Sequence, residues 1–168
     1  MLIVEDGSIV PGADSYISLA DARALADKYG WTLPTDDTQA DTALRNGAGY
    51  VGLQESAMCG SRVSPLQSLA YPRKNVTLYG FPVAITTIPD QIKLAQVIAA
   101  AEYGQGTDVR ASTDGRATSM ERVEGAVTVQ YFNNGATGAT TVITAAIDAL
   151  RPLLCGMNNG SSFNVYRG

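Results

Sequence analysis

The sequence predicts a mainly α-helical fold: a small bundle of about four helices with a β-hairpin and an extended C-terminal arm. Apolar residues recur at helical spacing in four stretches, each opened by a capping residue or a proline. Residues 119–132 instead alternate apolar and polar side chains, as a strand does. With 168 residues, 45% of them hydrophobic, the chain can bury one modest core.

The first helix is predicted between Ser18 and Gly30. Ser18 suits the N-cap, Asp21 completes a capping box, and glycine at position 30 favours the end of a helix. The residues at helical spacing that should face the core are Leu19, Ala22, Ala26 and Tyr29.

A second helix is predicted to start at Asp36 or Asp37. Its apolar face carries Ala40, Leu44, Gly47 and Val51. The helix also holds Gly49 and Gly52, and each glycine costs roughly 1 kcal/mol relative to alanine. Glycines at these positions are tolerable where another backbone packs close to the helix.

Residues 55–88 predict a long ordered loop with short extended pieces. It contains three cations, Arg62, Arg73 and Lys74, with Tyr71 and Tyr79, and basic residues interleaved with aromatic ones can bind single-stranded nucleic acid. We favour the alternative, in which the tyrosines anchor the loop on the core and the cations form surface salt bridges. The reason is the acidic balance of the chain, with 12 basic against 16 acidic residues.

The third helix is predicted from Pro89, with apolar residues on most of its sides, and so belongs at the centre of the bundle. Residues 119–132 predict a hairpin with a turn at residues 124–125. We expect the strand carrying Val127, Val129 and Tyr131 to contact a neighbouring subunit.

A short fourth helix is predicted over residues 144–154, with Thr144 as its cap and Pro152 disturbing its last turn. Residues 1–155 would then form one domain, and residues 156–168 an arm that reaches away from it. The arm residues that we expect to bind a partner are Phe163, Asn164, Val165, Tyr166 and Arg167.

The composition argues against catalysis. The chain has no histidine, which excludes Ser-His-Asp and Cys-His nucleophile systems, and it has no phosphate-loop motif. We therefore expect no enzyme, no cofactor and no metal site. Cys59 and Cys155 are expected to be free thiols in a reducing cytosol, with a disulfide as the alternative. We also expect no signal peptide and no membrane span.

The order of several short motifs resembles one family. Residues 4–7 are VEDG, residues 12–22 are GADSYISLADA, and residues 60–73 fit the pattern G-x-R-x-x-x-x-Q-x-L-x-[WY]-P-R. The helix from Pro89 and the hairpin at residues 121–131 also fit. Together these features are similar to tailed-bacteriophage head-tail adaptors, also called connector or head-completion proteins. Some members carry the label DnaT-like single-stranded DNA-binding protein.

The resemblance implies a structural virion protein in the neck of the particle, present in the host cytoplasm during assembly. Such proteins form a homo-oligomeric ring, usually a dodecamer, beneath the portal protein, and they join it to a tail, nozzle or stopper protein. Double-stranded DNA would pass through the lumen without specific binding, and the C-terminal arm would dock on the portal. The alternative function is a replication accessory protein that binds single-stranded DNA.

Overall fold

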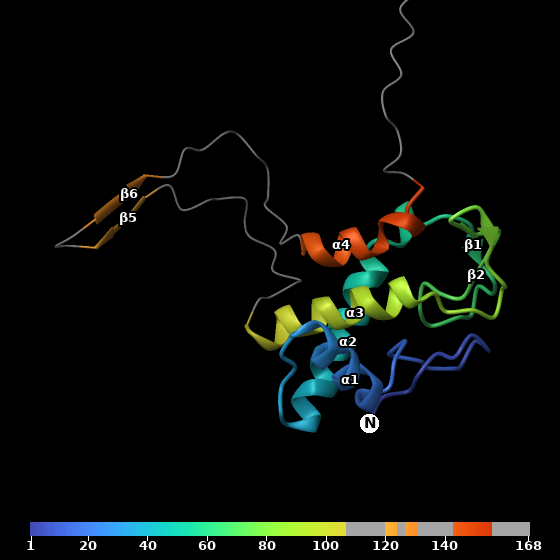
Figure 1. Ribbon diagram of the computed structural model, residues 1–168, viewed down its shortest axis with the longest axis horizontal. Helices are drawn as coiled ribbons and strands as arrows, with labels where there is room; N and C mark the ends of the chain where they lie inside the picture. The colour runs from blue at the N-terminus through green and yellow to red at the C-terminus, as the bar shows by residue number, and fades with distance from the viewer. Residues whose placement is uncertain (107–119, 124–126, 131–142, 156–168) are drawn as a thin grey trace, which may run out of the picture.

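Four α-helices form the body of the part of the chain that the structure describes. The computed structural model describes residues 1–106, 120–123, 127–130 and 143–155. The helices are α1 (Leu19–Tyr29), α2 (Asp37–Leu53), α3 (Asp90–Gly104) and α4 (Thr144–Leu150), and two 3-10 turns follow α2 and α4, η1 (Glu55–Ala57) and η2 (Arg151–Leu153). The predicted mainly α fold is confirmed. In Figure 1, α4 lies above α3 and α1 below it, while α2 crosses behind α3, and α3 contacts all three of these helices.

Three short antiparallel strand pairs complete the described residues. They are β1 (Ser61–Arg62) with β2 (Arg73–Lys74), β3 (Thr77–Leu78) with β4 (Phe81–Pro82), and β5 (Met120–Val123) with β6 (Val127–Gln130). The last pair confirms the predicted hairpin, with Val127 opposite Val123 and Val129 opposite Glu121. The predicted turn at residues 124–125 and Tyr131 lie outside the described residues, as does the arm at 156–168.

Helices α1 and α2 begin where the capping residues predict. The Ser18 hydroxyl accepts a hydrogen bond from the Asp21 amide, and the Asp36 carboxylate accepts one from the Gln39 amide. Gly30 ends α1 in a left-handed conformation. The prediction fails at Tyr29, which was assigned to the core face but is 50% exposed.

Helix α3 is the centre of the core, as its apolar composition predicts. Ile92, Ala95 and Val97 are fully buried. The predicted face of α2, which carries Ala40, Leu44, Gly47 and Val51, is buried as well. A Cβ atom on Gly47 would lie 2.3 Å from the carbonyl oxygen of Gln96 on α3. This glycine is therefore required by the close approach of two helix backbones, as the sequence suggested.

Gln96 connects three segments inside this core. Its side-chain amide donates hydrogen bonds to the Ser15 hydroxyl (2.8 Å) and the Leu44 carbonyl (2.9 Å). Its side-chain oxygen accepts a bond from the Tyr16 amide at 2.9 Å. Because the side chain is fully buried, these bonds replace the water that it would otherwise need.

The fourth helix and the cysteines differ from expectation. Thr144 is the first helical residue instead of the cap, a position that Ile143 occupies without a side-chain hydrogen bond. The effect of Pro152 is confirmed, since α4 ends at Leu150 and continues as the 3-10 turn η2. The expectation of free thiols was wrong: Cys59 and Cys155 form a disulfide. Backbone bonds from Cys59 to Leu153 and from Cys155 to Ala57 place the two segments side by side.

Candidate functional site

The loop between α2 and α3 is held by a partly buried network of polar side chains centred on Glu55. The Glu55 carboxylate accepts two hydrogen bonds from Arg62, at 2.6 and 2.7 Å, which is a bidentate pair. It also contacts Arg73 at 3.3 Å. The bonds from Arg62 hold the pKa of the Glu55 carboxyl below its ordinary value. One carboxylate therefore joins both arginines predicted for this loop.

Arg73 and Gln67 fix the backbone of the same loop. The Arg73 guanidinium is only 5% exposed and donates to the carbonyls of Cys59 (2.8 Å) and Gly60 (2.9 Å). The Gln67 side chain accepts from the amides of Val63 and Ser64 and donates to the carbonyls of Leu69 and Pro72. The conformation of the loop is thus set by its own hydrogen bonds.

Tyr71 anchors this loop in the core. Its side chain is fully buried, and its backbone amide donates to the hydroxyl of Tyr16, which is also buried. Burial raises the pKa of Tyr71 to about 12. The Tyr71–Pro72 peptide bond is cis.

The structure brings together three of the loop residues predicted as a group, Arg62, Tyr71 and Arg73. All three make contacts within the protein that hold the loop. The two guanidinium groups are paired with Glu55 and the tyrosine ring is buried, so none is free to stack on a base or to bind a phosphate.

The alternative that we favoured from the sequence is confirmed for Tyr71, which anchors the loop, and for Arg62, whose salt bridge is partly exposed. Arg73 forms its ion pair in a buried position, and Lys74 forms no salt bridge with a described residue. The alternative fails for Tyr79, which was expected to anchor the loop and is 73% exposed.

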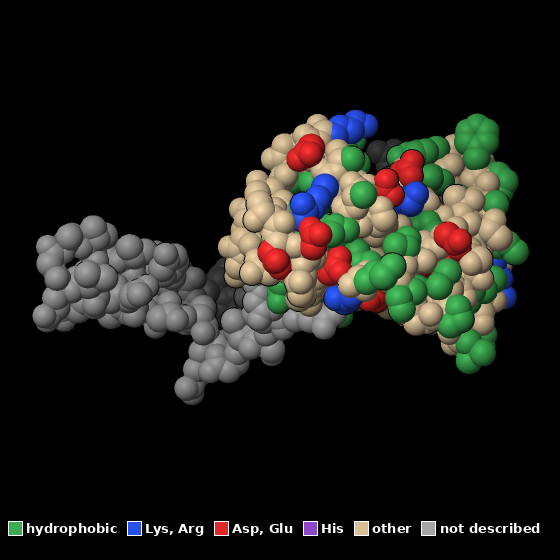
Figure 2. Space-filling model, turned by 90° about the horizontal axis from the view of Figure 1, so that it is seen from below, with side chains coloured by type: hydrophobic (Ala, Val, Ile, Leu, Met, Phe, Trp, Pro, Cys, Tyr) green, Lys and Arg blue, Asp and Glu red, His purple; other side chains and the backbone are tan. Residues whose placement is uncertain are grey.

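Tyr79 belongs to a short hairpin that presents apolar side chains to solvent. Tyr79 and Gly80, the two residues between β3 and β4, both have positive φ angles, of 52° and 87°. Phe81 on β4 is 74% exposed, and two other residues of the loop, Leu66 and Ile85, are 87% and 53% exposed. Hydrophobic side chains gather over the end of the molecule that carries this loop (Figure 2). Exposed aromatic groups on a rigid support are typical of protein–protein contacts.

A second exposed aromatic group lies at the end of α1. The rings of Tyr29 and Trp31 are stacked with their centroids 4.9 Å apart, and the Lys28 ammonium lies 5.4 Å from the centre of the Tyr29 ring. Such a group could accept one nucleic-acid base. Its electrostatic support is small, since Asp27 and Asp21 belong to the same short helix.

The positive charge of the described residues is largely paired. Each arginine whose side chain the structure describes forms a salt bridge with a carboxylate; these are Arg23, Arg45, Arg62, Arg73 and Arg151. Within the described ranges, no cluster of His, Cys, Asp and Glu could hold a metal ion. None of the described helices has the length and apolar character needed to span a bilayer. The arginines with described side chains are therefore paired with carboxylates, whereas Lys28 and Lys74 are exposed and form no salt bridge with a described residue.

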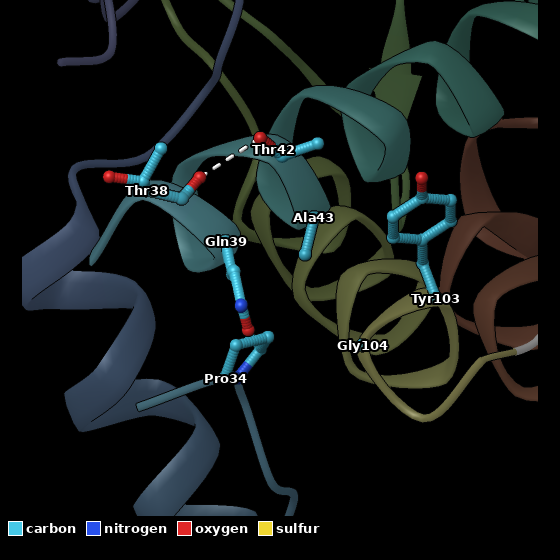
Figure 3. Close-up of a pocket in the computed structure, with 7 residues that line it drawn as sticks. All are labelled: Pro34, Thr38, Gln39, Thr42, Ala43, Tyr103 and Gly104. Carbon is cyan, nitrogen blue, oxygen red and sulfur yellow. Dashed lines mark hydrogen bonds between the residues drawn. The ribbon is translucent and has the colours of Figure 1, made fainter. Parts of the chain in front are cut away.

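A cavity of about 310 Å³ opens at the C-terminal end of α3 (Figure 3). Helix α2 contributes one wall, α3 another, and the turn before α2 closes it through Pro34. The residues that line the cavity are Pro34, Thr38, Gln39, Thr42, Ala43, Tyr103 and Gly104. None of these seven residues carries a charge. We call this site the α3-end cavity.

Other predicted site residues are not placed against a partner. Val127 and Val129 lie on β6. Tyr131 and the arm residues Phe163, Asn164, Val165, Tyr166 and Arg167 lie outside the described ranges. Their roles remain predictions.

Sequence reasoning missed two structural carboxylates, one partly buried and one fully buried. Glu55 had no role assigned, and Glu5 was noted only as part of the opening motif. The Glu5 carboxylate, 1% exposed, accepts hydrogen bonds from the amides of Gly7, Ile9 and Val10. The Glu-Asp-Gly sequence was the available signal, since a carboxylate before a glycine turn often binds the backbone amides of that turn.

Comparison with known proteins gives one match. The model of the family described as "Putative DnaT-like ssDNA binding protein" matches residues 1–168. Neither a curated protein nor a solved structure matches this chain. The description agrees with the label noted for some members of the resembled family, and it does not itself name head-tail adaptors. Because the match extends over the whole sequence, the chain belongs to the DnaT-like ssDNA-binding protein family.

Proposed function

We propose that this chain is a structural subunit that joins the head of a tailed bacteriophage to its tail, as a ring beneath the portal protein. The observation that carries the proposal is the exposed aromatic hairpin β3–β4 on a loop with a fixed conformation. An isolated domain gains nothing from Tyr79 and Phe81 in water, whereas burial against a partner stabilises each by roughly 1.5–3 kcal/mol. The family resemblance of residues 60–73 supports the same function.

The charge of the chain supports this role as well. A formal net charge of −4 and arginines paired with carboxylates suit a protein through whose ring DNA must slide. Free cations would hold the phosphates and slow the passage of DNA.

The test is binding to the purified portal protein of the same phage, followed by size-exclusion chromatography with light scattering. The full chain is expected to form a complex of defined stoichiometry. A chain that ends at residue 155 is expected to melt as the full chain does and to lose portal binding. If the full chain forms no complex, the connector function is wrong. If the shortened chain still binds, the arm is not the portal contact.

A second candidate function is binding of single-stranded DNA, favoured by the family description and by the Lys28, Tyr29 and Trp31 group. Fluorescence anisotropy with labelled oligothymidine separates the two functions. A DNA-binding protein should bind at about 50 mM salt and lose much of its affinity at about 200 mM. Tyr29→Ser should then weaken binding, and Tyr79→Ser should not. The connector predicts no binding at either salt concentration.

A further inference from the structure

We propose that copies of this chain contact one another head to tail, with hairpin β3–β4 of one copy inserted into the α3-end cavity of the next. Tyr79 and Phe81 are the side chains that enter. The inference deepens the proposed function and depends on it, because it specifies which surfaces close the ring.

The two surfaces lie at opposite ends of one helix. The hairpin lies beside the start of α3, where Tyr79 and Phe81 share a second cavity with Pro89, Asp90 and Gln91. The α3-end cavity includes Tyr103 and Gly104, the last two residues of the same helix. A helix of 15 residues is about 22 Å long. A hairpin therefore cannot reach the cavity of its own chain, but it can meet that of a neighbour.

The chemistry of the cavity suits an aromatic side chain. Its volume of about 310 Å³ is at the low end of the range for sites that bind small organic groups. Pro34, Ala43 and Tyr103 offer apolar contact, and Thr38 and Gln39 offer polar groups near a tyrosine hydroxyl (Figure 3). Two other cavities are lined by charged side chains, one by Glu5 and Asp6 and another by Arg23 and Asp27. Those would be poorer hosts for an aromatic ring.

Charge near the two surfaces is complementary. Lys74 follows the buried Arg73, precedes β3 closely and is exposed. Glu102 is exposed and directly precedes Tyr103, which lines the α3-end cavity. Within the described residues, neither of these side chains forms a salt bridge, so each is available to a neighbouring copy.

A contact between two different surfaces has a defined consequence for assembly. A growing assembly has one free hairpin at one end and one free cavity at the other. Copies can therefore be added until the rotation between neighbouring copies closes a ring. A single contact of this size is weak, and closure makes it strong because the last copy binds at two places.

Two surface variants test the contact in the full chain. Tyr79→Ser with Phe81→Ser removes the inserted side chains, and Thr42→Arg blocks the cavity from an exposed position. Leu53→Ser is the matched control, because Leu53 is an exposed apolar residue that lines neither surface. Sedimentation equilibrium over a concentration series measures self-association, and circular dichroism checks folding.

The wild type and the control are expected to associate beyond dimers, and each contact variant to do so at least about tenfold more weakly. An equal mixture of the two contact variants should stop at heterodimers, because only one intact hairpin and one intact cavity can meet. A wild type that stays monomeric, or contact variants that associate like the control, would overturn the contact. If the contact is overturned in this way, a wild type that still binds the portal protein leaves the connector function standing.

Discussion

Replacing Gly47 by alanine tests how closely α2 and α3 approach. A Cβ atom at this position would lie 2.3 Å from the Gln96 carbonyl oxygen, whereas ordinary contact begins at 3.4 Å. The helices must therefore separate by about 1 Å (3.4 minus 2.3). Overpacking costs about 1–3 kcal/mol, and the upper value applies because a helix carbonyl cannot turn aside as a side chain can. Alanine recovers about 1 kcal/mol of helix propensity, which leaves a net loss of about 2 kcal/mol.

Gly52→Ala is the matched control, since it lies in the same helix and a Cβ atom there would meet nothing within 4 Å. This variant should gain up to about 1 kcal/mol in the free energy of unfolding. Urea titration followed by circular dichroism measures both variants, with an unchanged slope as the sign of two-state unfolding. If Gly47→Ala is as stable as Gly52→Ala, the helices are not in backbone contact and the packing described here is wrong.

Three further predictions concern contacts made by side chains. Gln96→Leu leaves the Tyr16 amide without its partner and should cost about 1–3 kcal/mol in urea unfolding, while Gln91→Leu on the same helix should change stability little. Hydrogen bonds lower the pKa of Glu55 from its ordinary value of 4.5. The contribution of this carboxylate to the free energy of unfolding is therefore complete above pH 4.5 and falls as the pH drops below that value. Thermal melts of Glu55→Gln should lack that part of the acid dependence; a curve identical to the wild type would count against the network. Cys155→Ser should cost about 2–4 kcal/mol, because the disulfide closes a loop of 96 residues, and a reductant should remove the difference from the wild type.

The helices could be predicted from the sequence because their signals are local. Ser18, Asp36 and Pro89 each mark a helix start that depends on the neighbouring residues alone. The period of the apolar residues likewise identified α3 as central. Tyr29 was misassigned because it lies at the helical spacing of the core residues, yet the last turn of α1 extends past the core, where its ring stacks on Trp31.

The contacts of the loop and the cysteines could not be predicted, because they join residues far apart in the sequence. Glu55 precedes Arg73 by 18 residues, and Cys59 precedes Cys155 by 96. Neither spacing carries a local pattern. The proline content of residues 55–88 indicated an ordered loop, but not which side chains hold it and which face solvent.

The disulfide also fixes where the last residues of the chain begin. Cys155 is held beside Ala57 and Cys59, so the peptide that follows starts next to the loop that carries hairpin β3–β4. Reduction would remove this covalent link and leave the backbone hydrogen bonds between Cys59 and Leu153 and between Cys155 and Ala57 to hold the two segments together.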